Sequence, residues 1–224
     1  MSSDFAQLTN QGRHSFLRYC VDSKRETLAT SVAYFEDALA ACPLNHHCRP
    51  AALCNLARAY FIRYQAHDEV MELSIPISYY QEALDLRHVG HPDRPATLLN
   101  LAKVLLYRFG KLGSESPSQI TKLASEVLTS CSMDSHEHRA VGLILQTYAL
   151  YKAIDSGSLV DIDKLIPELR QAIQDVTYDY FDKPQRLSNL SLALWMRYKS
   201  YSDVDALNES ISTCGLISVF VCHV

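Results

Sequence analysis

The stretch AYFEDALAACPLNHHCRPAALCNLARAYFIRY, residues 33–64, matches SYYQEALDLRHVGHPDRPATLLNLAKVLLYRF, residues 78–109, without a gap. The constant offset of 45 residues places Arg49-Pro50 on Arg94-Pro95 and Asn55 on Asn100. Self-similarity at a fixed period of about 20 to 50 residues is typical of proteins built from stacked structural repeats. The sequence therefore predicts a fold built from a repeating structural unit.

The same register extends towards both ends of the chain. One period back, Asn10 aligns with Asn55, and at an offset of 89 Asn100 aligns with Asn189, with a degenerate copy between them. The expected first helices lie near residues 7–19, 51–65, 96–110, 140–154 and 185–199. The expected second helices lie near residues 26–41, 71–87, 118–131, 160–176 and 203–214.

Each expected helix carries apolar or small residues on one face, as Leu165, Leu169 and Ile173 illustrate. A lone helix pair cannot bury such a face, so each pair must stack on its neighbours. We expect an all-α solenoid of antiparallel helix pairs, with about five repeats and the last one incomplete. The array should cover residues 1–217, with repeats near 7–41, 51–87, 96–131, 140–176 and 185–217, and an atypical tail at 218–224.

These positions resemble the tetratricopeptide repeat, whose first helix reads W-x2-L-G-x2-Y. Here the pattern is Leu53, Leu56, Ala57 and Tyr60, with Leu in place of Trp and Ala in place of Gly. The long period and the GHPDRP connector at 90–95 look like the divergent arrays of mushroom-forming (basidiomycete) fungi. The resemblance implies a right-handed solenoid whose first helices line a concave, partner-binding face.

Composition excludes several classes of protein. The 224 residues carry 21 Lys and Arg against 25 Asp and Glu, a net charge of −4 without long single-sign blocks, which argues against a nucleic-acid surface. Neither a signal peptide nor an apolar run long enough for a membrane span is found. Seven cysteines without a C-x-x-C pair indicate reduced thiols and a cytoplasmic protein.

The resemblance places the residue two positions after the repeat's central Leu in the concave groove. Arg13, Arg58 and Lys103 hold this position in three successive repeats, a stripe suited to an acidic segment or a carboxylate. A solvated helix face is the simpler alternative. Trp195 is a further candidate for partner binding, with a core position as its alternative.

Asparagine recurs at one register position of the first helix, and we expect a role in packing between repeats because Asn is locally unfavourable inside a helix. The residues are Asn10, Asn55, Asn100 and Asn189.

Histidines and cysteines crowd the connectors, namely Cys42, His46, His47 and Cys48 in one and His136 and His138 in another. Because His46 recurs as His91 without a cysteine beside it, we expect a repeat feature that makes a hydrogen bond or caps a helix, and neither a metal site nor any cofactor.

The leading functional interpretation is a non-enzymatic scaffold that binds a peptide or helix of a protein partner in its groove. The alternative is the sensor arm of a fungal signalling protein whose caspase-like or nucleotide-binding effector domain lies outside this chain. An enzyme is the remote alternative, since no phosphate-binding loop or nucleophilic set is found. The apolar C-terminal end also predicts self-association.

Overall fold

The computed structural model describes the backbone of residues 2–113, 117–174 and 183–221. Within these ranges the chain forms ten α-helices, a short 3-10 helix and no strand, which confirms the all-α prediction. The elements are α1 (Ser2–Asp22), α2 (Arg25–Ala41), α3 (Arg49–His67), η1 (Val70–Leu73), α4 (Ser74–Leu86), α5 (Arg94–Leu112), α6 (Pro117–Ser130), α7 (His136–Asp155), α8 (Leu159–Gln174), α9 (Lys183–Tyr201) and α10 (Val204–Val221).

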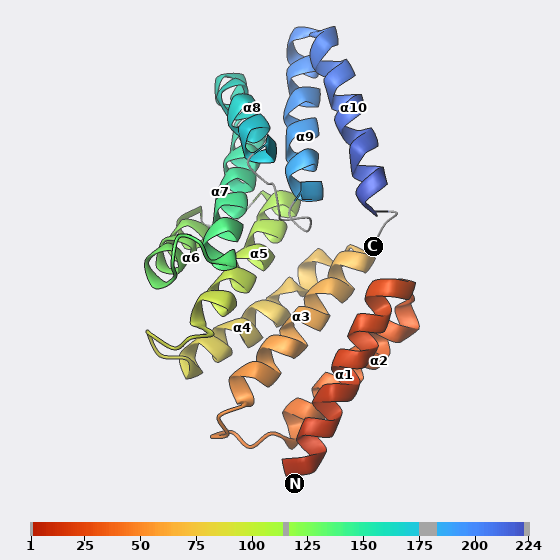
Figure 1. The fold of residues 1–224 in the computed structure, drawn as a ribbon, viewed down its shortest axis with the longest axis vertical. Coiled ribbons are helices and arrows are strands. Elements are labelled where there is room, and N and C mark those ends of the chain that lie inside the picture. The colour runs from red at the N-terminus through yellow and green to blue at the C-terminus, as the bar shows by residue number, and fades with distance from the viewer. Residues whose placement is uncertain (1, 114–116, 175–182, 222–224) are drawn as a thin grey trace. The chain divides into compact units, whose positions relative to one another are not determined.

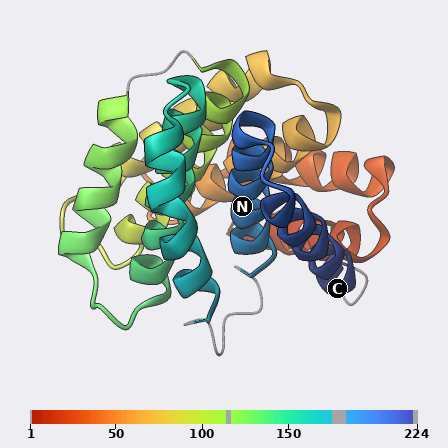
Figure 2. The same ribbon diagram turned by 90° about the horizontal axis from the view of Figure 1, so that it is seen from above.

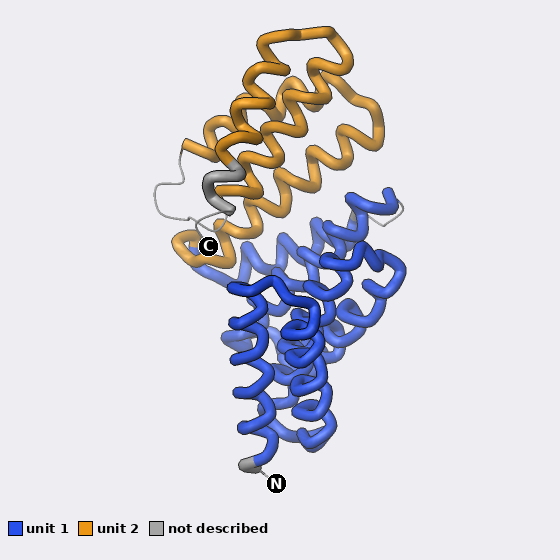
Figure 3. The backbone as a smooth tube through the Cα atoms, turned by 90° about the vertical axis from the view of Figure 1, so that its right-hand side faces the viewer, with its two compact units in different colours: residues 1–132 blue, residues 133–224 orange. Residues whose placement is uncertain are grey.

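The helices fall into two compact units, residues 1–132 and residues 133–224 (Figure 3). In the first unit α1 packs on α2, α3 on α4 and α5 on α6; in the second, α7 packs on α8 and α9 on α10 (Figures 1 and 2). Each second helix also contacts the first helix that follows it within its unit, as α2 contacts α3 and α8 contacts α9. Helix pairs of the expected order and position are therefore present in both units.

Apolar side chains on the inner faces of these helices form the core of each unit. In the first unit Leu28 and Phe35 of α2 pack with Leu56 of α3, and all are buried. In the second unit Ile166 of α8 packs with Leu194 of α9. Burying one such side chain stabilises the fold by about 1.5–3 kcal/mol, so the contacts between neighbouring helices hold each unit together.

The turn inside every helix pair contains one residue in the left-handed backbone region. These residues have φ between 51° and 67° and recur at intervals of 45, 45, 44 and 45 residues: Ser23, Asp68, Gly113, Gly157 and Ser202. A residue of this conformation commonly ends a helix, because it lets the following chain reverse direction. The backbone thus repeats with the period of the sequence, including the fourth pair, whose sequence is degenerate.

Helix α10 continues further than the sequence pattern suggests. The second helix of the last pair was expected to end near residue 214, but α10 runs to Val221, because the apolar residues after 214 include no helix-breaking proline. Residues 222–224 of the expected tail lie outside the described part of the chain. None of the described helices is both long enough and apolar enough to cross a membrane.

Candidate binding surface and side-chain clusters

The three cations of the expected stripe lie on first helices of the first unit. Arg13 of α1 and Arg58 of α3 are exposed, and Lys103 of α5 is half-buried. The guanidinium of Arg58 lies 5.0 Å from the centroid of the Phe16 ring of α1, a cation–π contact between successive first helices. This contact holds the guanidinium of Arg58 over the Phe16 ring, and the residue as a whole is exposed.

Arg13 and Arg58 differ from the arginines that hold the helix pairs together. Within the described residues, neither forms an ion pair with a carboxylate of the chain. By contrast, Arg49 lies 3.1 Å from Glu82, and Arg94 lies 2.7 Å from Glu126. The positive charges of Arg13 and Arg58 are therefore not neutralised by a neighbouring acid.

The arginine at the start of α3 and of α5 also connects one pair to the next. Arg49 donates to the carbonyl oxygen of Cys42, the residue after α2. Arg94 likewise donates to the carbonyl oxygens of Leu84 and Arg87 at the end of α4. The alignment of Arg49 with Arg94 in the sequence indicated a shared structural role, because the same residue type occupies one position in two repeats.

Trp195 lies on α9 in the second unit. Its side chain is 44% exposed, and the Nζ atom of Lys199 lies 5.3 Å from its ring centroid. The neighbouring Met196 packs against the core cluster of the unit. Trp195 is thus at the surface, where a large apolar ring is available to a partner.

The four recurring asparagines have different surroundings. Asn189 of α9 is buried, and its Nδ2 atom donates to Thr147 Oγ1 of α7 over 2.7 Å, while its Oδ1 accepts from Gln185. Asn55 and Asn100 are half-buried and Asn10 is exposed. Only the asparagine of the second unit therefore joins two first helices through a buried hydrogen bond in the described structure.

An offset of 179 residues aligns α1 with α9, and the outer face of α1 is polar where that of α9 is buried. Gln7, Asn10, Gln11 and His14 of α1 line a shallow depression beside Ser15 and Tyr34. The aligned residues of α9 are Arg186, Asn189, Leu190 and Ala193, all buried. The same register positions are thus polar in α1 and packed in the core in α9.

Gly12 of α1 is a further constrained position. A methyl group at this residue would lie 2.7 Å from two carbons of the buried Phe35 ring, and the Gly12 carbonyl oxygen accepts a buried hydrogen bond from Ser31. Alignment with Ala57 and Ala102, the small position of the repeat, was the available signal. Gly12 lets α1 and α2 approach closely.

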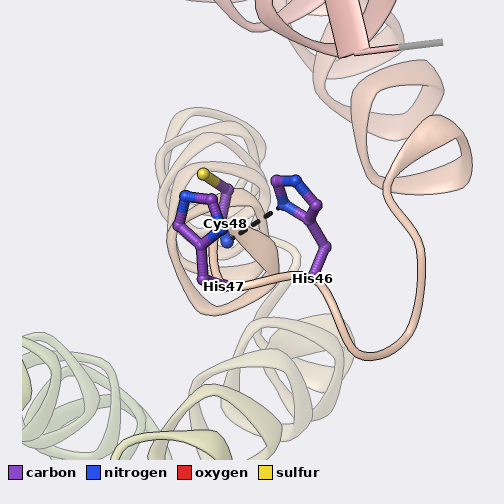
Figure 4. A group of neighbouring side chains, drawn as sticks. All are labelled: His46, His47 and Cys48. Carbon is purple, nitrogen blue, oxygen red and sulfur yellow. Dashed lines mark hydrogen bonds between the residues drawn. The ribbon is translucent and has the colours of Figure 1, made fainter.

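His46, His47 and Cys48 form a cluster in the connector between α2 and α3 (Figure 4). One ligand-capable atom from each side chain lies within 4.8 Å of the other two. The two imidazole rings stack with centroids 4.4 Å apart, and the Nδ1 atom of His46 accepts from the backbone N–H of Cys48 over 3.2 Å. The bond to Cys48 satisfies a backbone donor at the start of α3, the capping role expected for this histidine.

Burial acts on two thiols of the first unit, the buried Cys42 and the half-buried Cys54. Burial raises the pKa of the Cys54 thiol, against opposing effects of Arg87 and Thr97. Burial also raises the pKa of the Cys42 thiol, with Arg49 acting in the opposite direction and Cys48 in the same one. Because the thiolate is the reactive form, both side chains are held in their less reactive state.

No protein-family model and no curated protein sequence matches the chain. Two crystal structures of a Podosopora anserina protein are similar to it, both described as a kinesin light chain with nearly identical TPR-like repeats, one of them carrying a single substitution. The TM-scores are 0.56 and 0.55 at 15% and 16% identity, and the matches cover 96% and 93% of this chain and 95% of each of the other two. The chain therefore has a tetratricopeptide-like fold.

Proposed function

We propose that the protein is a non-enzymatic scaffold whose first helices bind an acidic segment of a protein partner. The observation that carries this proposal is the presence of two exposed arginines, Arg13 and Arg58, without a carboxylate partner in the described structure. Lys103 extends the cationic set to the third first helix of the same unit. Arg pairs well with carboxylates because its planar donors match their geometry.

The tetratricopeptide-like fold supports this function, since such helical repeats generally present extended surfaces for protein partners. The six described cysteines are free thiols, which fits a reducing compartment, and we place the protein in the cytoplasm on that basis. The charges of the partner would raise its association rate, so binding should weaken as salt is added.

An affinity purification from lysate of the source organism tests this proposal. The bait would be the unaltered chain or a variant carrying Arg13→Glu, Arg58→Glu and Lys103→Glu. A matched control carries Lys24→Glu, Arg25→Glu and Lys122→Glu, which reverse three exposed charges outside the first helices. We expect partners that are lost with the first variant and kept with the control. If both variants lost the same partners at unchanged helicity, the loss would come from the change in net charge, and the proposal would be wrong.

We further propose that the protein self-associates through α10. This helix exposes Val204, Ile211 and Leu216 at 60%, 61% and 50%, whereas the outer face of α1 is polar. Light scattering at tens of micromolar should report a species larger than the monomer, and Ile211→Asp should restore the monomer because it puts a charge on the apolar face. A monomeric unaltered chain would refute this proposal.

A further inference from the structure

The first two connectors of the chain align residue by residue but carry different side chains. Connector 1, between α2 and α3, holds Cys42, His46, His47 and Cys48, and connector 2, between α4 and α5, holds Arg87, His91, Pro92 and Asp93 at the same positions. The histidine is the only one of the four positions that is kept. Comparison of the two connectors therefore separates what the repeat requires from what is particular to connector 1.

The shared histidine makes the same hydrogen bond in both connectors. His91 Nδ1 accepts from the N–H of Asp93 over 3.1 Å, as His46 Nδ1 accepts from the N–H of Cys48 over 3.2 Å. Connector 2 forms this bond with proline and aspartate after the histidine. The imidazole of His47 and the thiol of Cys48 are therefore not needed for it.

The ends of connector 2 are joined by an ion pair. Arg87 Nη2 lies 3.3 Å from Asp93 Oδ2, and a second guanidinium nitrogen donates to the Asp93 carbonyl oxygen over 3.4 Å. Connector 1 has Cys42 and Cys48 at these two positions. Cys42 is buried and Cys48 is half-buried, so two thiols stand where the next repeat has two opposite charges.

We propose that connector 1 binds Zn²⁺ through His46, His47 and Cys48, and that Cys42, which lies outside this group of three in the structure, moves in as the fourth ligand. The first three offer ligand atoms that already lie within 4.8 Å of one another, on consecutive residues at the start of α3 (Figure 4). Structural zinc sites are tetrahedral, with Zn–S near 2.3 Å and Zn–N near 2.0–2.1 Å, which separates neighbouring ligand atoms by about 3.3–3.8 Å. The three ligand atoms must therefore approach one another by up to about 1.5 Å when the metal binds.

The charges at the site suit a divalent cation. Two thiols that release their protons on binding supply two negative charges, which match Zn²⁺, and the imidazoles bind as neutral ligands. Arg49 is the neighbouring cation, and its guanidinium is engaged by Glu82 on α4 at 3.1 Å. The metal would thus join the ends of connector 1, as the Arg87–Asp93 ion pair joins those of connector 2.

Metal binding also rearranges the hydrogen bond of His46. Its Nδ1 atom accepts from the N–H of Cys48, and we assign Nε2 as the metal ligand. A neutral imidazole that binds a metal at Nε2 carries its proton on Nδ1, and the hydrogen bond to Cys48 must then open. His91 makes the same bond in a connector without thiols, so its proton should stay on Nε2.

The experiment titrates the reduced full chain with Co²⁺ and then with Zn²⁺, following the near-ultraviolet thiolate charge-transfer band and the visible bands of tetrahedral cobalt. We expect one equivalent to bind and Zn²⁺ to displace Co²⁺ with a submicromolar Kd. Cys48→Ser should weaken Zn²⁺ binding about 100-fold and Cys42→Ser about 10-fold or more, in the range expected for a lost contact in a metal site. Cys131→Ser, which alters a half-buried thiol outside the cluster, should leave binding unchanged.

Two results would overturn the proposal. Equal Zn²⁺ affinity of the unaltered chain and of both Cys48→Ser and His47→Asn would identify an adventitious ion only, and Cys42→Ser with unchanged affinity would remove Cys42 as the fourth ligand. A ¹H–¹⁵N long-range correlation spectrum provides an independent readout. It should show the proton of His46 moving from Nε2 to Nδ1 on Zn²⁺ addition while His91 does not change. No change at His46, or the same change at both histidines, would contradict the assigned site.

Discussion

Helices α1 and α9 hold equivalent places in the repeat, yet they face different surroundings. His14 of α1 is exposed, whereas the aligned Ala193 of α9 is fully buried. Gln11 of α1 is half-buried, whereas Leu190 of α9 belongs to the core of the second unit. The position of a residue in the repeat therefore determines the direction of its side chain. The helices packed beside it determine whether that side chain can be polar.

Exchanging residues between the two helices should give the largest effect. Ala193→His places an imidazole where α8, α9 and α10 pack together, and we expect a loss of about 3–5 kcal/mol in the free energy of unfolding of the second unit. His14→Ala should change stability by less than about 0.5 kcal/mol, because that side chain is solvated. Urea unfolding of both variants measures the two values. Similar losses for both would show that α1 and α9 are buried alike.

The recurring asparagine offers the next comparison. Asn189→Ala removes the buried donor to Thr147 and should cost about 1–3 kcal/mol, because the Thr147 hydroxyl then loses its partner across the interface. Asn10→Ala should be neutral or slightly stabilising, because alanine has the higher helix propensity. Native-state hydrogen exchange in α7 and α9 follows the first variant. A cost of less than about 0.5 kcal/mol would mean that Asn189 contributes little to packing.

The close contact between α1 and α2 predicts an intermediate effect. Gly12→Ala should destabilise the first unit by about 1–3 kcal/mol, since the added methyl group meets the buried ring of Phe35. The matched control is Gly142→Ala in α7, where nothing lies within 4 Å of the added methyl group, and it should stabilise by about 0.5–1 kcal/mol. Thermal unfolding distinguishes the two signs. Stabilisation by both would mean that α1 does not approach α2 so closely.

The smallest effect concerns a feature that the two units share. Ser23 and Ser202 have φ of 51° and 56°, a region where glycine is less strained than serine. Ser23→Gly and Ser202→Gly should each relieve about 0.5 kcal/mol of backbone strain in the folded protein. The entropy that glycine adds to the unfolded chain offsets part of this gain in stability. Chemical unfolding of each single variant and of the double variant measures the two changes. Opposite signs at the two sites would show that the turns are not equivalent.

The sequence predicted the fold well because the repeat appears in local patterns. Apolar spacing located the ten described helices with bounds within about five residues, except for α10, which ends seven residues beyond the expected position. One gap-free match set the register. Arg13 and Arg58 are exposed in the structure, and their role in partner binding stays a prediction.

Other features depend on neighbours that are distant along the chain. The bond from Asn189 to Thr147 spans 42 residues, and nothing near Asn189 distinguishes it from the exposed Asn10. The Arg49–Glu82 pair likewise joins separate helices. The clustering of His47 and Cys48 beside His46 depends on side-chain directions in a connector, and periodicity predicts only helices.

The regular spacing of the left-handed turn residues has a consequence for how such a chain changes length. Because Ser23, Asp68 and Gly113 are 45 residues apart, removal of residues 46–90 would join Asn45 to His91 and leave a connector of unchanged length before α5. Duplication of the same segment would insert one more helix pair through a single new junction, from Gly90 to His46, at the same place in the connector. Unequal recombination between repeats can therefore lengthen or shorten the gene by whole helix pairs while the spacing of the remaining turns is kept.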